Sequence, residues 1–144
     1  SNNNFSYNKS AGLTLISATN CIVSGNNFVK NIEGNSVIQS CTQAVITGNT
    51  MIGVAGSDYA MYMQSNTNCS VTGNVFTGHK WALISNVGSN TDILVGNNIF
   101  RGQVTNSIEF HSSDSNILLT GNNFRGQTIS LGTGANIISA NNME

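Results

Sequence analysis

The sequence predicts an all-β fold, a parallel β-helix (solenoid) of about six coils with three short strands in each. The first observation is an asparagine that recurs at steps of 23, 23, 25, 24, 24 and 19 residues, at Asn3, Asn26, Asn49, Asn74, Asn98, Asn122 and Asn141. Each copy lies in one local pattern, clearest in CIVSGNNF, CSVTGNVF and ILLTGNNF. A fixed period of this length is typical of solenoids, in which each repeat buries its apolar face against its neighbours.

The second observation is alternation of apolar and polar residues in two segments of each repeat, as in strands with one buried face. The first segment carries Leu13/Leu15, Met61/Met63, Ile108/Phe110 and Ile129/Leu131. The second, within the motif, carries Cys21/Val23, Ala44/Ile46, Cys69/Val71, Ile93/Val95 and Ile117/Leu119. A third, shorter strand carries Phe28, Met51, Phe76, Phe100 and Phe124. Three strands per coil predict a triangular section and three parallel sheets.

We assign the recurring asparagine to architecture. It lies at a corner between the second and third strands, where asparagine tolerates the left-handed backbone conformation. Its amide both donates and accepts, so a column of asparagines can hydrogen-bond to itself along the stack. Glycine precedes it in most copies, and Asn2, Asn97 and Ala140 take that position in the others. We therefore expect an asparagine ladder with small or amide residues beside it.

Composition narrows the functional classes. Charged residues make up 8% of the chain and the net charge is −1, which argues against a nucleic-acid partner. No apolar run is long enough for a membrane span. Cys21 and Cys69 share one repeat position two coils apart, roughly 9–10 Å, beyond disulfide reach. We expect these thiols and Cys41 to be free, and we predict no cofactor and no metal site.

One alternative fold is the leucine-rich repeat, which has a similar period. It requires a leucine eight positions before each asparagine. The residues found there are Ala18, Cys41, Asn66, Asn90 and Asp114. These residues are mostly polar, and the rest of each unit alternates like a strand, so the β-helix is preferred.

The units NCIVSGNNF, QAVITGNTM, NCSVTGNVF and NILLTGNNF resemble the repeats of right-handed parallel β-helices of the pectin-lyase-like superfamily. The resemblance covers essentially the whole chain, and right-handedness also follows from the general rule for parallel crossovers. The superfamily includes polysaccharide lyases, glycoside hydrolases, epimerases and phage tailspikes that recognise bacterial surface polysaccharide. The resemblance implies a ligand groove along the sheet of the first strands, although none of the family's catalytic motifs is present.

Ionic and aromatic residues gather in the third to fifth coils, near that sheet. Because Met61 and Met63 point inward, Tyr62 and Gln64 are expected to point outward. The predicted substrate-binding residues are Tyr59, Tyr62, His79, Lys80, Trp81, Arg101, His111 and Arg125. The orientation of Trp81 stays open, because the alternation in KWALIS fits either face.

Two carboxylates are candidate catalytic groups, since glycoside hydrolysis uses a pair about 5–9.5 Å apart. Glu109 is the candidate acid and Asp58 its partner, two coils away or roughly 10 Å. A lyase needs instead a base and a cation, for which Lys80, Arg101 or His111 are candidates. A solvated surface role for Glu109 and His111 remains open beside both.

The leading functional hypothesis is a phage tailspike or tail-fibre-type protein, located in the virion or extracellular. Residues 1–144 are expected to be one β-helix segment of a longer chain that forms a homotrimer. The expected partner is a bacterial surface polysaccharide, which the protein binds and, as an enzyme, hydrolyses. The first alternative is a secreted polysaccharide lyase or epimerase. The second is a non-catalytic structural or adhesive β-helix.

Overall fold

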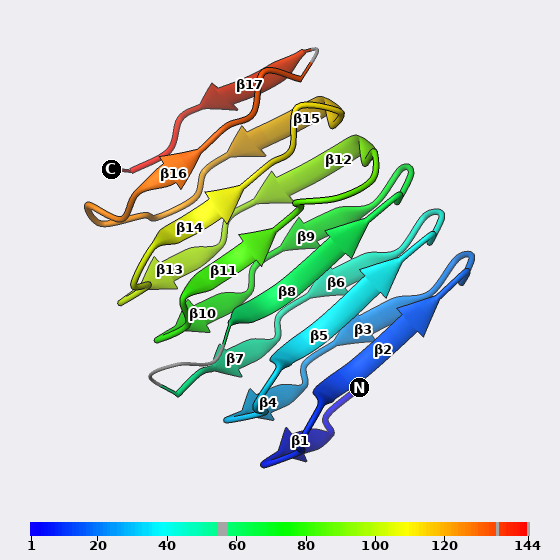
Figure 1. The fold of residues 1–144 in the computed structure, drawn as a ribbon, viewed down its shortest axis with the longest axis vertical. Coiled ribbons are helices and arrows are strands. Elements are labelled where there is room, and N and C mark those ends of the chain that lie inside the picture. The colour runs from blue at the N-terminus through cyan, green and yellow to red at the C-terminus, as the bar shows by residue number, and fades with distance from the viewer. Residues whose placement is uncertain (55–57, 135, 144) are drawn as a thin grey trace.

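The computed structural model describes residues 1–54, 58–134 and 136–143, and it confirms a parallel β-solenoid of stacked coils (Figure 1). Sheet A contains β1 (Asn4–Ser6), β4 (Asn27–Val29), β7 (Thr50–Ile52), β10 (Val75–Thr77) and β13 (Ile99–Arg101). Sheet B contains β2 (Ala11–Ile16), β5 (Gly34–Gln39), β8 (Tyr59–Gln64), β11 (Trp81–Ile84), β14 (Asn106–Glu109) and β16 (Ile129–Ser130). Sheet C contains β3 (Ile22–Ser24), β6 (Val45–Thr47), β9 (Ser70–Thr72), β12 (Thr91–Gly96), β15 (Ser115–Thr120) and β17 (Ile137–Ala140).

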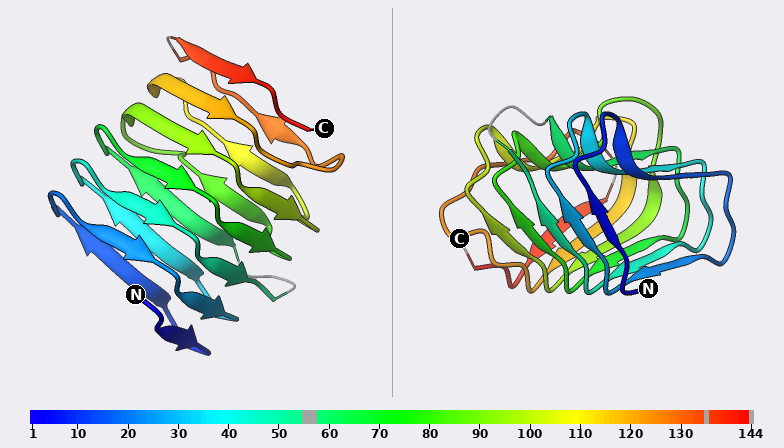
Figure 2. Two further views of the ribbon diagram at one scale, coloured as in Figure 1. Left: turned by 180° about the vertical axis from the view of Figure 1, so that it is seen from behind. Right: turned by 90° about the horizontal axis from the view of Figure 1, so that it is seen from below.

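The core lies inside the coils, between the three sheets (Figure 2). Each inward position is paired in register with the same position of the next coil, as in the column Met61, Leu83 and Ile108 of sheet B. Under sheet A, phenylalanine rings of the predicted third strands stack on one another. The ring centroids of Phe76 and Phe100 are 5.0 Å apart with an interplanar angle of 12°. Identical residues at one repeat position therefore pack face to face along the axis.

The asparagine ladder is confirmed over most of the chain. The backbone N–H and side-chain amide of Asn26 donate to Oδ1 of Asn49, at 2.9 and 3.0 Å. The same pair of bonds links Asn49 to Asn74, and continues through Asn98 to Asn122. Each buried amide therefore satisfies two donors of the preceding coil, which an apolar residue at this corner leaves unpaired.

Two details of the predicted ladder are wrong. Asn122 donates to Asn142, 20 residues on, and not to Asn141, because strand register aligns Thr120 with Ala140 and so Gly121 with Asn141. The left-handed residue is also not the ladder asparagine but the one before it. The φ angles at that position are 62° at Gly25, 64° at Gly48 and Gly73, 65° at Gly121, 58° at Asn2, 53° at Asn97 and 53° at Asn141. The residue before the ladder asparagine therefore makes the sharp turn of the corner, and the asparagine itself need not adopt a left-handed conformation.

A second polar ladder, not predicted from the sequence, lies at the corner between sheets B and C. The backbone N–H of Cys41 donates to Oδ1 of Asn66, and Asn66 donates to Asn90 at 2.9 Å. Asn90 donates in turn to Oδ1 of Asp114, whose Oδ2 accepts the backbone N–H of His111. These residues occupy the positions that argued against a leucine-rich repeat. Their recurrence once per coil, at the same repeat position, is the feature of the sequence that indicates a ladder.

The three cysteines are free, as predicted, with Cys41 and Cys69 buried and Cys21 partly buried. In the part of the chain that the structure describes, no helix is long and apolar enough to cross a membrane.

Candidate functional site

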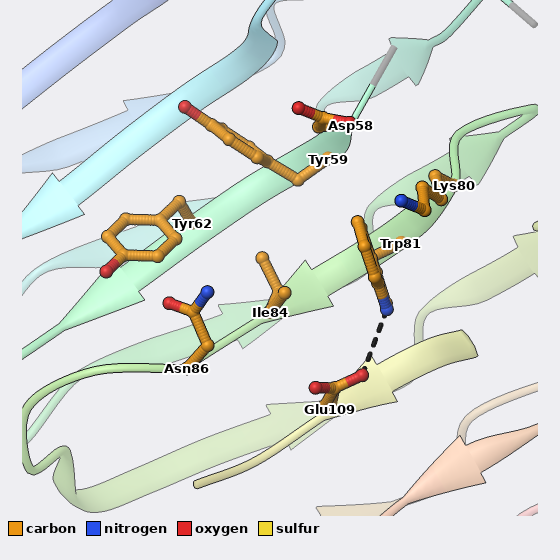
Figure 3. Close-up of a pocket in the computed structure, with 8 residues that line it drawn as sticks. All are labelled: Asp58, Tyr59, Tyr62, Lys80, Trp81, Ile84, Asn86 and Glu109. Atoms are coloured by element: carbon orange, nitrogen blue, oxygen red, sulfur yellow. Dashed lines mark hydrogen bonds between the residues drawn. The ribbon is translucent and has the colours of Figure 1, made fainter. Parts of the chain in front are cut away.

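A hollow of about 310 Å³ lies on the outward face of sheet B, over the third to fifth coils (Figure 3). Its lining combines three aromatic rings, two carboxylates, one ammonium group, one amide and one aliphatic side chain. The residues are Asp58, Tyr59, Tyr62, Lys80, Trp81, Ile84, Asn86 and Glu109. Six of them had been selected from the sequence as binding or catalytic candidates.

Strand register places these side chains in two columns that run along the solenoid axis. Trp81 pairs with Tyr59 of the preceding coil and with Asn106 of the following one. Ile84 pairs in the same way with Tyr62 and Glu109. The hollow is therefore lined by residues from consecutive coils, and no single strand supplies all of them.

The orientation of Trp81 follows from a break in the alternation of β11. Ala82 and Leu83 are both fully buried, and the strand pairings skip Ala82 on both sides. Two successive inward residues shift the alternation by one position, so Trp81 and Ile84 line the same outward hollow (Figure 3). Simple period-2 alternation does not predict this shift.

Several contacts hold the polar and aromatic groups in place. The indole N–H of Trp81 donates to Oε2 of Glu109 at 2.9 Å, and the Asn106 amide donates to the same oxygen at 2.9 Å. The ammonium nitrogen of Lys80 lies 4.1 Å from the centre of the Trp81 ring. In Figure 3, Lys80 lies on one side of that ring and Ile84 on the other.

The two tyrosines form the opposite wall. Their ring centroids are 5.7 Å apart with an interplanar angle of 46°. The Tyr59 ring packs over Gly34 and takes the space that a Cβ would fill there. Burial raises the pKa of the Tyr59 hydroxyl, and the nearby charges of Glu33 and Asp58 raise it further. Tyr59 therefore remains a neutral hydroxyl at neutral pH.

The remaining predicted binding residues do not line the hollow. His79 is buried, with 1% of its surface exposed, and its Nε2 lies 2.7 Å from the Asn35 amide nitrogen. His111 is exposed, and its Nδ1 lies 2.7 Å from Oγ of Ser113. Arg101 is the exposed last residue of β13 in sheet A, and Arg125 is exposed in the turn directly after Phe124, one coil further on.

The two candidate catalytic carboxylates line the hollow but stand at opposite ends of it. The Asp58 carbonyl accepts the Trp81 N–H, whereas Glu109 aligns with Tyr62, four residues further along the strand. Four residues and two coils separate their backbones by roughly 16 Å. The estimate of roughly 10 Å from the sequence counted only the coil rise. Two-carboxylate hydrolysis by this pair stays a prediction that the register does not favour.

Residues 1–143 match the model of a protein family described as "Periplasmic copper-binding protein (NosD)". The chain belongs to the NosD family. This family lies within the right-handed β-helix, pectin-lyase-like group, so the resemblance found in the repeats is confirmed at the level of that group. Comparisons with curated proteins and with solved structures gave no match.

Proposed function

We propose that this NosD-family β-helix binds a glycan in the hollow of sheet B. The observation that carries the proposal is the convergence of Tyr59, Tyr62 and Trp81 with hydrogen-bonding groups in one open hollow of about 310 Å³. Sugar rings have apolar C–H faces rimmed by hydroxyl groups. Aromatic rings suit those faces, and a few fixed polar groups at the rim give orientation and specificity.

Glu109 is positioned in the hollow before any ligand binds. Glu109 is fixed by two N–H donors on one oxygen, Oε2, which leaves its Oε1 outside both bonds. Asn86 and the two tyrosine hydroxyls supply neutral donors and acceptors around the same space. Preorganised groups of this kind lose little entropy on binding, which supports recognition of a flexible sugar chain.

Copper binding, which the family description names, does not fit the residues in the structure. Among the residues described, no group of three or more His, Cys, Asp or Glu side chains is arranged so that it could hold a metal ion. Burial raises the pKa of the Cys21 and Cys69 thiols, which disfavours the thiolate form that binds metals. His79 and His111 lie in different surroundings, one buried and one exposed. We therefore do not propose a copper site for these coils.

The family description also supports an extracytoplasmic location, which we propose for this chain. A bacterial surface polysaccharide is the partner that such a location and such a hollow both suit. The family match gives no support to a phage tailspike or a virion location, and neither is carried forward. Homotrimer formation remains a prediction, to be tested by light scattering in solution.

A glycan-array screen tests the proposal, using the wild-type chain and two tyrosine variants. Tyr62→Ala removes one of the two tyrosine rings that form one wall of the hollow. Tyr7→Ala removes a tyrosine that is 70% exposed and does not line the hollow. We expect wild-type and Tyr7→Ala proteins to bind the same glycans, and Tyr62→Ala to lose at least tenfold in affinity. Equal binding by all three proteins, or binding to no glycan, contradicts the proposal.

A further inference from the structure

We infer that the hollow selects a glycan bearing free amino groups, and that it discriminates against uronic-acid glycans. The inference rests on the proposed function and specifies the chemical class of its ligand. It is carried by two features of the hollow: an ammonium group of the chain itself already lies against an aromatic ring there, and carboxylates outnumber cations along the lining.

The Lys80 ammonium shows where a ligand cation fits. Its nitrogen lies 4.1 Å from the centre of the Trp81 ring, well inside the distance at which a cation is attracted to an aromatic face. Tyr59 and Tyr62 provide two more aromatic rings in the same hollow. Aromatic rings arranged around one space are a recurring means of recognising ammonium groups.

The charges point to the same ligand class. Asp58 and Glu109 line the hollow, and Lys80 is the one cationic side chain among the lining residues described. The excess of negative charge attracts a protonated amine and repels a sugar carboxylate. Lys80 is exposed, and a cation–aromatic contact is weak at an exposed site, so a ligand amine can displace its ammonium group from the ring.

Three tetrasaccharide probes test the inference by calorimetry at low salt. The first is β-1,4-linked glucosamine, the second is its N-acetylated counterpart of the same length and linkage, and the third is tetragalacturonate. A cation–aromatic contact and one screened ion pair together predict about tenfold tighter binding of the amine than of the N-acetyl form. The advantage is expected to shrink at high salt, because screening weakens the ionic part.

Two variants assign the selectivity to named groups. Glu109→Gln keeps an acceptor for Trp81 and removes the charge, so the ratio of amine affinity to N-acetyl affinity is expected to fall from about tenfold to about threefold. Lys80→Met removes the competing cation and is expected to tighten amine binding. Equal or tighter binding of the N-acetyl form or of the galacturonate by the wild type overturns the inference while leaving glycan binding intact. If no glycan binds the wild-type chain in a way that depends on Tyr62, the proposed function itself is contradicted.

Discussion

Trp81 donates its indole N–H to Oε2 of Glu109 at 2.9 Å, across the boundary between two coils. The two residues are 28 positions apart, on the neighbouring strands β11 and β14 of sheet B. The bond fixes the edge of the tryptophan ring and one oxygen of the carboxylate together. The candidate site is therefore a property of the stack, and its geometry depends on the ladders that hold successive coils in register.

Loss of this bond is expected to change the surroundings of Trp81. Glu109→Leu replaces a charged acceptor at the indole N–H by an aliphatic side chain, so we expect the emission of Trp81, the one tryptophan of the chain, to shift to shorter wavelength. The free energy of unfolding is expected to fall by about 1–2 kcal/mol, because Trp81 and Asn106 both lose their acceptor. Glu109→Gln keeps an acceptor and is the matched control, with emission close to wild type. An unchanged spectrum in Glu109→Leu contradicts the observed contact.

The asparagine ladder is expected to be the main polar determinant of stability. Asn74→Ala removes the acceptor of two Asn49 donors and the donor to three oxygens, all within the corner. Buried polar groups left unpaired cost about 1–3 kcal/mol each, so we expect a total loss of about 2–4 kcal/mol. Urea unfolding measures it. The control is Asn27→Ala, an exposed asparagine of β4, for which a change of similar size would be evidence against the ladder's role.

The second ladder makes a sharper prediction at Asp114, which is fully buried. Its two oxygens accept N–H groups of Asn90 and of His111. In Asp114→Asn one of these oxygens becomes an NH₂ group that faces an N–H donor. We expect a destabilisation of about 1–3 kcal/mol in urea unfolding. Asp92→Asn, at an exposed position, is expected to be nearly neutral; equal effects at both sites would contradict this assignment.

Stability is expected to depend on pH through His79. Burial lowers the pKa of His79 from 6.5 to about 4, so between these values the unfolded chain binds a proton that the folded chain does not. The stabilising contribution is thus fully present above pH 6.5 and is lost as the pH falls toward 4, by roughly 3 kcal/mol.

A substitution at His79 isolates this dependence from the titration of the carboxylates. The Val104 N–H donates to the His79 carbonyl, so His79 aligns with Gln103 on the next coil, and glutamine fits this corner. Unfolding of wild type, His79→Gln and the exposed control His111→Gln is measured from pH 7.5 to 4. We expect the wild-type slope to be reduced only in His79→Gln. Parallel curves for all three proteins would rule out a role for His79.

Most of the fold could be predicted from the sequence because the same pattern of buried residues recurs in every coil of the solenoid. The columns of Phe28 and Val71 follow directly from spacing and alternation. The position of the last ladder residue could not be predicted, because the pattern fits Asn141 and Asn142 almost equally and only strand register decides. The burial of His79 was also missed, because polar corner residues can face either the core or solvent.

The candidate site was predicted in part. Tyr62 and Glu109 face outward because their strand neighbours are apolar, which is a local property. The position of Trp81 depends on the extra inward residue Ala82, and such a break in alternation leaves no mark in a period-2 pattern. The separation of Asp58 from Glu109 depends on the distance between them along the strand direction. The number of coils between them does not give that distance.

A titration of Trp81 fluorescence with a glycan from the array screen tests the central claim most directly. Trp81 is the single tryptophan and lines the hollow, so its emission reports on that site alone. We predict a saturable change in emission for the wild type, weakened at least tenfold in Tyr62→Ala and preserved in Tyr7→Ala. Binding by calorimetry with no change in Trp81 emission would place the glycan elsewhere and contradict the account.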